Sequence, residues 1–69
     1  MDRATLLADL AMTRRHVAEG IVQLARQRAV IERMTERGRD TSDAISLLDR
    51  FEDIQGEHIA HRDRLEAMI

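Results

Sequence analysis

The chain has 69 residues, of which 43% are apolar and 35% charged, and its formal net charge is −2. It contains no cysteine and no proline, so neither disulfides nor a cysteine-ligated zinc can stabilise its small core. The apolar content is too high for a disordered tail, and acidic and basic residues are interspersed without a basic stripe. This pattern argues against nucleic acid or an anionic membrane as a partner.

The N-terminal half predicts one long helix over about residues 4–37, capped by Asp2 or Thr5. Apolar residues repeat every seven positions along it and form a seam for a packed helix. The seam consists of Leu10, Val17, Leu24 and Ile31, flanked by Leu7 and Ile21 on one side and by Leu6 and Met34 on the other. With Asp2 at the start and no apolar run of about 20 residues, we expect a cytoplasmic protein without a signal peptide or membrane span.

A reversal is predicted at residues 38–41. Gly38 suits the left-handed conformation that ends a helix, and Asp40, Thr41 and Ser42 are residues that start one. The second helix is expected over about residues 42–68. A connection this short makes the two helices antiparallel neighbours. Residues 1–69 therefore predict a single all-α domain, a coiled-coil-like antiparallel helical hairpin.

The second helix has a seam of its own, interrupted by Gly56. Its members are Leu47, Phe51, Ile54, His58, His61, Leu65 and Met68. Folding at the turn is expected to pair residues whose numbers sum to about 79, which places Gly20 opposite His58. The same register predicts four cross-helix ion pairs: Arg26–Asp53, Arg28–Glu52, Glu19–Arg62 and Arg15–Glu66.

Two helices enclose one line of side chains, and this chain has more apolar surface than one line needs. Exposed apolar patches of several hundred Å² usually mark an interface, so we expect two hairpins to dimerise into a four-helix bundle. The predicted interface consists of Ala18, Val22, Ala25, Ala29, Ile45, Leu48 and Ile59. Parallel and antiparallel packing of the dimer remain open, and a different protein is the alternative partner.

The three histidines are the candidates for chemistry, because His58 and His61 lie on one helical face within the seam. A metal-binding bundle would use His16, Glu19, Glu57, His58 and His61. A structural polar layer is the preferred interpretation, since the glutamate and Glu-x-x-His set of known bundle-core metal sites is incomplete. Because imidazoles titrate near neutrality, an assembly that loosens toward pH 5 is a third possibility.

No enzymatic function and no cofactor are predicted. The serines and threonines lack a histidine–carboxylate arrangement that would activate a nucleophile, and a rod has no deep pocket. Arg14 and Arg28 could bind an anion, but their stems are better explained as a cover for the core. The expected function is a protein-interaction or assembly module that acts as a homo-oligomer, or a regulatory module for a larger partner.

The segment from His16 to Leu65 contains the motifs HVAEG, ARQR, RGRDTSDA and LLDRFEDIQGEHIAHRDRL. In these motifs the chain resembles small stand-alone helical proteins of alphaproteobacteria, especially of rhizobial relatives. That group shares a G-x-D-T turn and a second helix that closes in H-x-x-H-R-D-R-L. The resemblance implies an alphaproteobacterial origin and the hairpin form. The group has no assigned activity, so no functional site is transferred.

Overall fold

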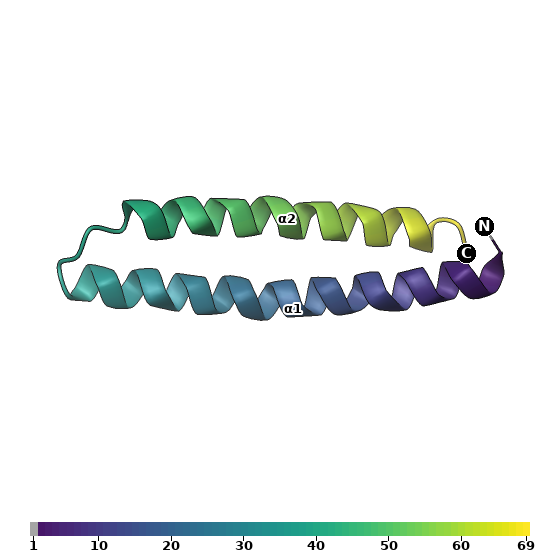
Figure 1. Cartoon of the computed structure of the whole chain (residues 1–69), viewed down its shortest axis with the longest axis horizontal. Coiled ribbons are helices and arrows are strands. Elements are labelled where there is room, and N and C mark those ends of the chain that lie inside the picture. Colours follow the sequence, from purple (N-terminus) through teal and green to yellow (C-terminus); the bar gives the residue numbers. More distant parts are fainter. Residues whose placement is uncertain (1) are drawn as a thin grey trace.

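The computed structural model describes residues 2–69; Met1 lies outside the described part. Two helices, α1 (Arg3–Glu36) and α2 (Ser42–Glu66), run antiparallel and side by side over nearly their whole length (Figure 1). The resulting rod measures 53 × 15 × 13 Å. The all-α helical hairpin predicted from the sequence is thereby confirmed.

The helices begin and end close to the expected positions. A side-chain oxygen of Asp2 accepts a hydrogen bond from the backbone N–H of Thr5 at 2.7 Å, which confirms Asp2 as the N-cap. This bond favours the ionised carboxylate and lowers the pKa of Asp2. Relative to the sequence prediction, α1 begins and ends one residue earlier, and α2 ends two residues earlier.

The turn is fixed by its own backbone. Gly38 has a φ of 67°, a conformation that costs other L-residues about 1–2 kcal/mol. The N–H of Gly38 donates to the carbonyl of Thr35 at 3.0 Å, and the N–H of Arg39 donates to that of Met34 at 2.9 Å. These two bonds form a Schellman motif, which satisfies carbonyls that the end of a helix leaves unpaired.

The start of α2 depends on Asp40. One of its carboxylate oxygens accepts from both the hydroxyl of Ser42 at 2.7 Å and the backbone N–H of Ser42 at 2.9 Å. The two bonds hold the pKa of Asp40 below its usual value. Since Thr41 makes no side-chain capping bond, Asp40 is the residue that stabilises this end of the helix.

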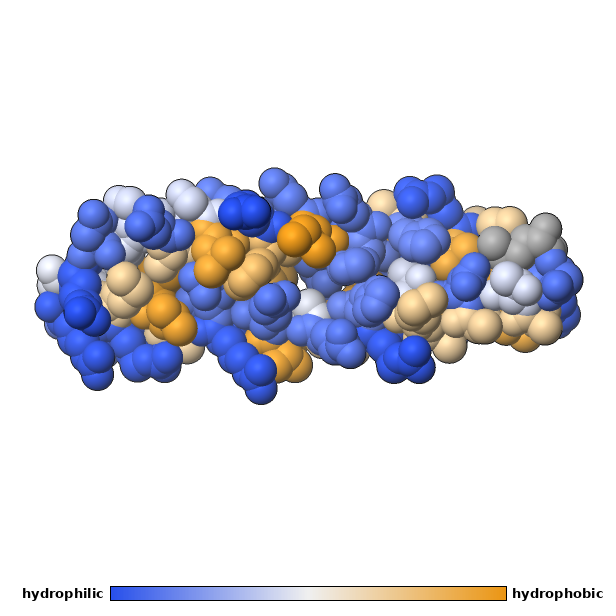
Figure 2. Space-filling view, viewed as in Figure 1, coloured by the Kyte–Doolittle hydropathy of each residue, from blue (hydrophilic) through white to orange (hydrophobic). Residues whose placement is uncertain are grey.

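The core is small and lies at the open end of the hairpin, away from the turn. Four apolar side chains of the described residues are buried: Leu6, Leu10, Val17 and Leu65. Toward the turn the seam residues Leu24, Ile31 and Phe51 are half-buried, while Leu47 and Ile54 are exposed. In Figure 2 the largest group of hydrophobic residues on the visible face lies in the half that contains the turn. The turn-proximal half therefore lacks an enclosed core.

The register differs from the predicted one. Gly20 lies against Gln55 rather than His58, and a Cβ at Gly20 would lie 2.5 Å from Cδ of Gln55. His58 instead packs on His16, with ring centroids 4.9 Å apart. The residue numbers in each of these pairs sum to about 75 instead of the expected 79. One helix is therefore shifted along the other by about four residues, or one helical turn, from the predicted register.

Gln55 is the buried polar residue that bonds across the helix–helix contact; the other buried polar side chain of the described residues, Thr13, bonds to the carbonyl of Asp9 in its own helix. Only 6% of Gln55 is exposed, and its Nε2 donates to the carbonyl of Val17 at 2.9 Å. Its Oε1 is buried without a hydrogen-bond partner and lies over Gly20, where the missing side chain makes room for it. The predicted polar layer is thus made by Gln55, because His16 and His61 are exposed and His58 is half-buried.

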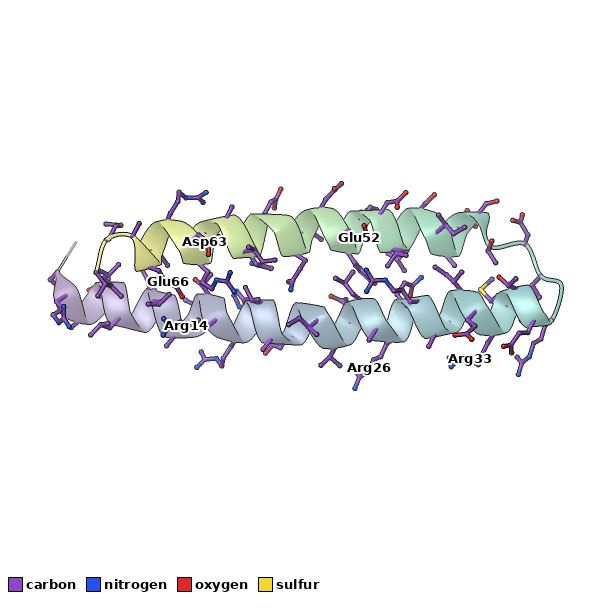
Figure 3. The ribbon with its side chains drawn as sticks, turned by 180° about the vertical axis from the view of Figure 1, so that it is seen from behind. Arg14, Arg26, Arg33, Glu52, Asp63 and Glu66 are labelled. Atoms are coloured by element: carbon purple, nitrogen blue, oxygen red, sulfur yellow. The ribbon has the colours of Figure 1, made fainter. Side chains whose placement is uncertain are left out.

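The predicted ion pairs are partly correct. Arg28 and Glu52 approach to 3.7 Å as expected, whereas Glu66 pairs with Arg14 at 3.1 Å rather than with Arg15. Arg62 pairs with its neighbour Asp63 at 3.0 Å instead of reaching Glu19. Arg26 and Arg33 point away from α2 (Figure 3), so the pair predicted between Arg26 and Asp53 is wrong.

Candidate interaction surface

The most informative feature of the surface is its apolar content. Ile21 is 62% exposed, and other large apolar side chains on both helices are more than a third exposed. They include Leu7, Met12, Val22, Ile45, Leu47 and Ile54, and after the end of α2 also Met68 and Ile69. Side chains of this size belong in a core, yet even Leu47 and Ile54, two members of the predicted α2 seam, are left open to solvent by the hairpin.

The predicted interface residues are divided between two sides of the molecule. The row of α1 that faces α2 contains Gly20, Leu24, Gln27 and Ile31. Val22 and Ala29 fall midway between members of that row, so the helical period of 3.6 places them on the back of α1. The α2 residues Ile45, Leu48 and Ile59 flank the contact between the helices. One flat partner cannot cover the back of α1 and this flank together, so the predicted set is not a single surface.

A single face is defined instead by the two cross-helix ion pairs. On α1, Arg14, Ile21 and Arg28 are seven residues apart, and on α2, Ile45, Glu52, Ile59 and Glu66 are also seven apart. A seven-residue spacing keeps each set on one side of its helix. Since Arg14 bonds Glu66 and Arg28 approaches Glu52, the two rows lie on the same side of the hairpin. We call these seven residues the Arg–Glu face.

The Arg–Glu face alternates charged and apolar positions. The numbers of Ile21 and Ile59 sum to 80, as do those of the two ion pairs, so both isoleucines lie at the level between the pairs. Ile21 is exposed and Ile59 half-buried, and both ion pairs are open to solvent. Ala18 and Ala25 lie next to Ile21 along the outer edge of the face, where small side chains allow a close approach.

Ile21 is the residue that sequence reasoning missed. As a flanking member of the α1 seam it was expected to pack against α2, yet it is the most exposed of the large apolar side chains described. The signal was present in its heptad, because seven-residue steps connect Ile21 to Arg14 and Arg28 rather than to the buried Leu10 and Val17. A row that alternates arginine and isoleucine is typical of the border of a buried stripe.

The opposite side of the hairpin contains the histidines. The rings of His16 and His58 meet at an angle of 49° across the two helices. Between residues 2 and 69, no group of three or more histidine, aspartate or glutamate side chains is arranged to hold a metal ion. Within one hairpin, the five residues proposed as ligands therefore yield one histidine pair and not a complete site.

Other ligand sites have little support in the described part of the chain. A surface hollow is lined by Glu19, Val22, Gln23 and Arg26, all from the outer side of α1. A hollow formed by one helix does not enclose a small molecule. Neither α1 nor α2 has the length and hydropathy needed to cross a membrane.

Comparison of the chain with protein-family models, curated proteins and solved structures finds no match. The resemblance to alphaproteobacterial hairpin proteins therefore stays a prediction.

Proposed function

We propose that this protein is a non-enzymatic assembly module, which works as a homodimeric four-helix bundle. The observation that supports the proposal is the exposure of its apolar side chains. The total solvent-accessible surface of the hairpin, polar and apolar together, is 5124 Å². A folded monomer of 7.9 kDa is expected to have a total accessible surface of about 4,400 Å². The difference of about 700 Å² is close to the ~800 Å² that each partner buries in a standard interface.

Self-association also supplies what the single hairpin lacks. The half near the turn has half-buried seam residues, such as Leu24, Ile31 and Phe51, and no enclosed core among the described residues. A second hairpin would cover these side chains from one side and turn a two-helix contact into a closed bundle. The charged residues beside the apolar positions would then select the partner, because like charges brought together oppose wrong pairings.

The test is the mass in solution, measured by sedimentation equilibrium with and without a chelator. We expect a dimer that the chelator does not dissociate. Ile21→Asp should dissociate it, because the new carboxylate would enter the interface without a partner. Met12→Asp is the matched control: Met12 is 44% exposed on the same helix but lies off the Arg–Glu face, so its dimer should persist. A wild-type chain that remains monomeric at millimolar concentration refutes the proposal.

Metal binding is the second candidate function. The observation in its favour is the contact of His16 and His58, which brings two imidazole rings from facing helices together. Elemental analysis of the purified protein distinguishes the two functions. Stoichiometric metal that is lost in His58→Ala and His61→Ala would favour metal binding, and its absence from the wild-type protein would exclude it.

A further inference from the structure

We propose that the second copy docks on the Arg–Glu face with its turn at the same end of the bundle, so that α1 of each chain packs against α2 of the other. This inference rests on the proposed function, and it adds the face and the direction of packing. It follows from the order of charges on that face. The arginines of the two cross-helix pairs, Arg14 and Arg28, both come from α1, and the glutamates, Glu52 and Glu66, both come from α2.

Two symmetric arrangements bring the faces of two hairpins together. If the two-fold axis runs along the rod, both turns lie at the same end and α1 of one copy lies over α2 of the other. If the axis crosses the rod, the turns lie at opposite ends and α1 lies over α1. An isologous interface requires one of these two arrangements when the face is flat and elongated.

The charges favour the axis along the rod. In that arrangement the arginine row of each copy lies over the glutamate row of the other, at matching levels. Arg14 and Glu66 of the two chains would form one ring of alternating charge, Arg28 and Glu52 a second, with the isoleucines 21 and 59 between them. In the crossed arrangement arginine rows face each other and glutamate rows do the same, and such like-charge contacts are costly across an interface.

The hydrogen bonds within the hairpin leave capacity for these contacts. Nε and an Nη of Arg14 both donate to the same oxygen of Glu66, Oε1, at 3.3 and 3.1 Å. The second oxygen of that carboxylate can therefore accept from an arginine of the partner, since a carboxylate offers about four acceptor positions. Arg28 and Glu52, at 3.7 Å, are too far apart for a hydrogen bond and can be drawn together by a partner.

The dimensions agree with a dimer through this face. A face of 53 by 15 Å has a footprint of about 800 Å², which matches the contribution of one partner to a standard interface. The exposed side chains Ile21 and Ile45 and the half-buried Ile59 lie on it. A second copy is the partner that satisfies both requirements, because it presents the same apolar positions and the complementary charge rows.

Spin labels at the turn test the direction. The chain has no cysteine, so Arg39→Cys provides a single labelling site on the exposed turn. With both turns at one end, the distance between labels should be below about 30 Å, because packed helices lie about 10 Å apart. Mild oxidation should also produce a disulfide-linked dimer. A label distance near the 53 Å length of the rod, in a sample whose mass is that of a dimer, overturns the direction and leaves the proposed function standing.

Charge reversal tests the face. An acidic variant (Arg14→Glu with Arg28→Glu) and a basic variant (Glu52→Arg with Glu66→Arg) should each dimerise at least about tenfold more weakly than wild type. Mixed together, they should form a heterodimer, which also shows that both variants fold. The matched control, Arg26→Glu with Arg33→Glu, makes the same charge change on side chains that point away from α2 (Figure 3) and should dimerise normally.

The outcomes separate the two proposals. If both charge-reversed variants dimerise with unchanged affinity, the Arg–Glu face is not the dimer interface. The same conclusion follows if the control variant dissociates and the charge-reversed variants do not. A wild-type chain that sediments as a monomer would refute the assembly function itself and this inference with it.

Discussion

Gly20 and Gly56 are both glycines within helices, but the structure predicts opposite effects when they are replaced by alanine. A Cβ at Gly56 would meet no atom within 4 Å, whereas a Cβ at Gly20 would overlap the carboxamide of Gln55. That carboxamide is buried and bonded to the carbonyl of Val17. Gly20→Ala therefore requires Gln55 to give up its position between the helices.

The size of each effect follows from the contacts. Alanine is favoured over glycine inside a helix by about 1 kcal/mol, and Gly56→Ala should stabilise the protein by about that amount. Gly20→Ala has the same advantage, but it loses the bond from Gln55 to Val17, worth about 1 kcal/mol, and it overpacks the contact at a cost of about 1–3 kcal/mol. We expect a net loss of about 1–3 kcal/mol, so the two variants should differ by about 2–4 kcal/mol.

Urea unfolding followed by far-UV circular dichroism measures this difference. All variants must be compared at one protein concentration, because association with a second copy raises the apparent stability. Replacing Gln55 by alanine in the Gly20→Ala background removes the overlapping carboxamide, so the double variant should lose less than the two single losses added together. Equal stabilisation by Gly20→Ala and Gly56→Ala would show that Gln55 does not occupy the space over Gly20.

Three further predictions follow from the core, the turn and the second helix cap. Leu10 is 2% exposed, so Leu10→Ala should lower the free energy of unfolding by about 2–5 kcal/mol. A small shift in the urea midpoint would contradict the role of Leu10 as the centre of the core. Because Gly38 has a φ of 67°, Gly38→Ala should lower the free energy of unfolding by about 1–2 kcal/mol in the same assay, and Gly38→Asn should lower it less. The hydroxyl and N–H of Ser42 lower the pKa of Asp40 below 3.8, so its contribution is present above pH 3.8 and lost as the pH falls through the lowered pKa. Asp40→Ala should therefore lower the melting temperature at pH 7 but make little difference below that pKa; a constant difference would contradict this account.

The position of the reversal was determined by local sequence. Gly38 ends α1 and Asp40 starts α2, because a left-handed backbone and a side-chain capping bond depend on residues within one turn. Asp2 as the N-cap of α1 is predictable for the same reason. The apolar repeat of seven also identified the buried Leu10 and Val17, since a helix hides one side wherever it packs.

The register and the uncovered face were decided by tertiary structure. A shift of one helix along the other by one helical turn still keeps apolar side chains opposite one another. The seven-residue apolar repeat alone therefore could not determine whether His58 or Gln55 packs against Gly20. Neighbouring residues of a helix point about 100° apart, so Arg14 and Arg15 cannot both face Glu66, and the packing of the helices places Arg14 beside it. Ile21 belongs to a flank whose burial depends on how many helices surround it. The sequence by itself thus determined where the chain bends and which stripes are apolar, because these are properties of single helices. Which side chains interlock, and which remain uncovered, depends on the fit of one helix surface against another.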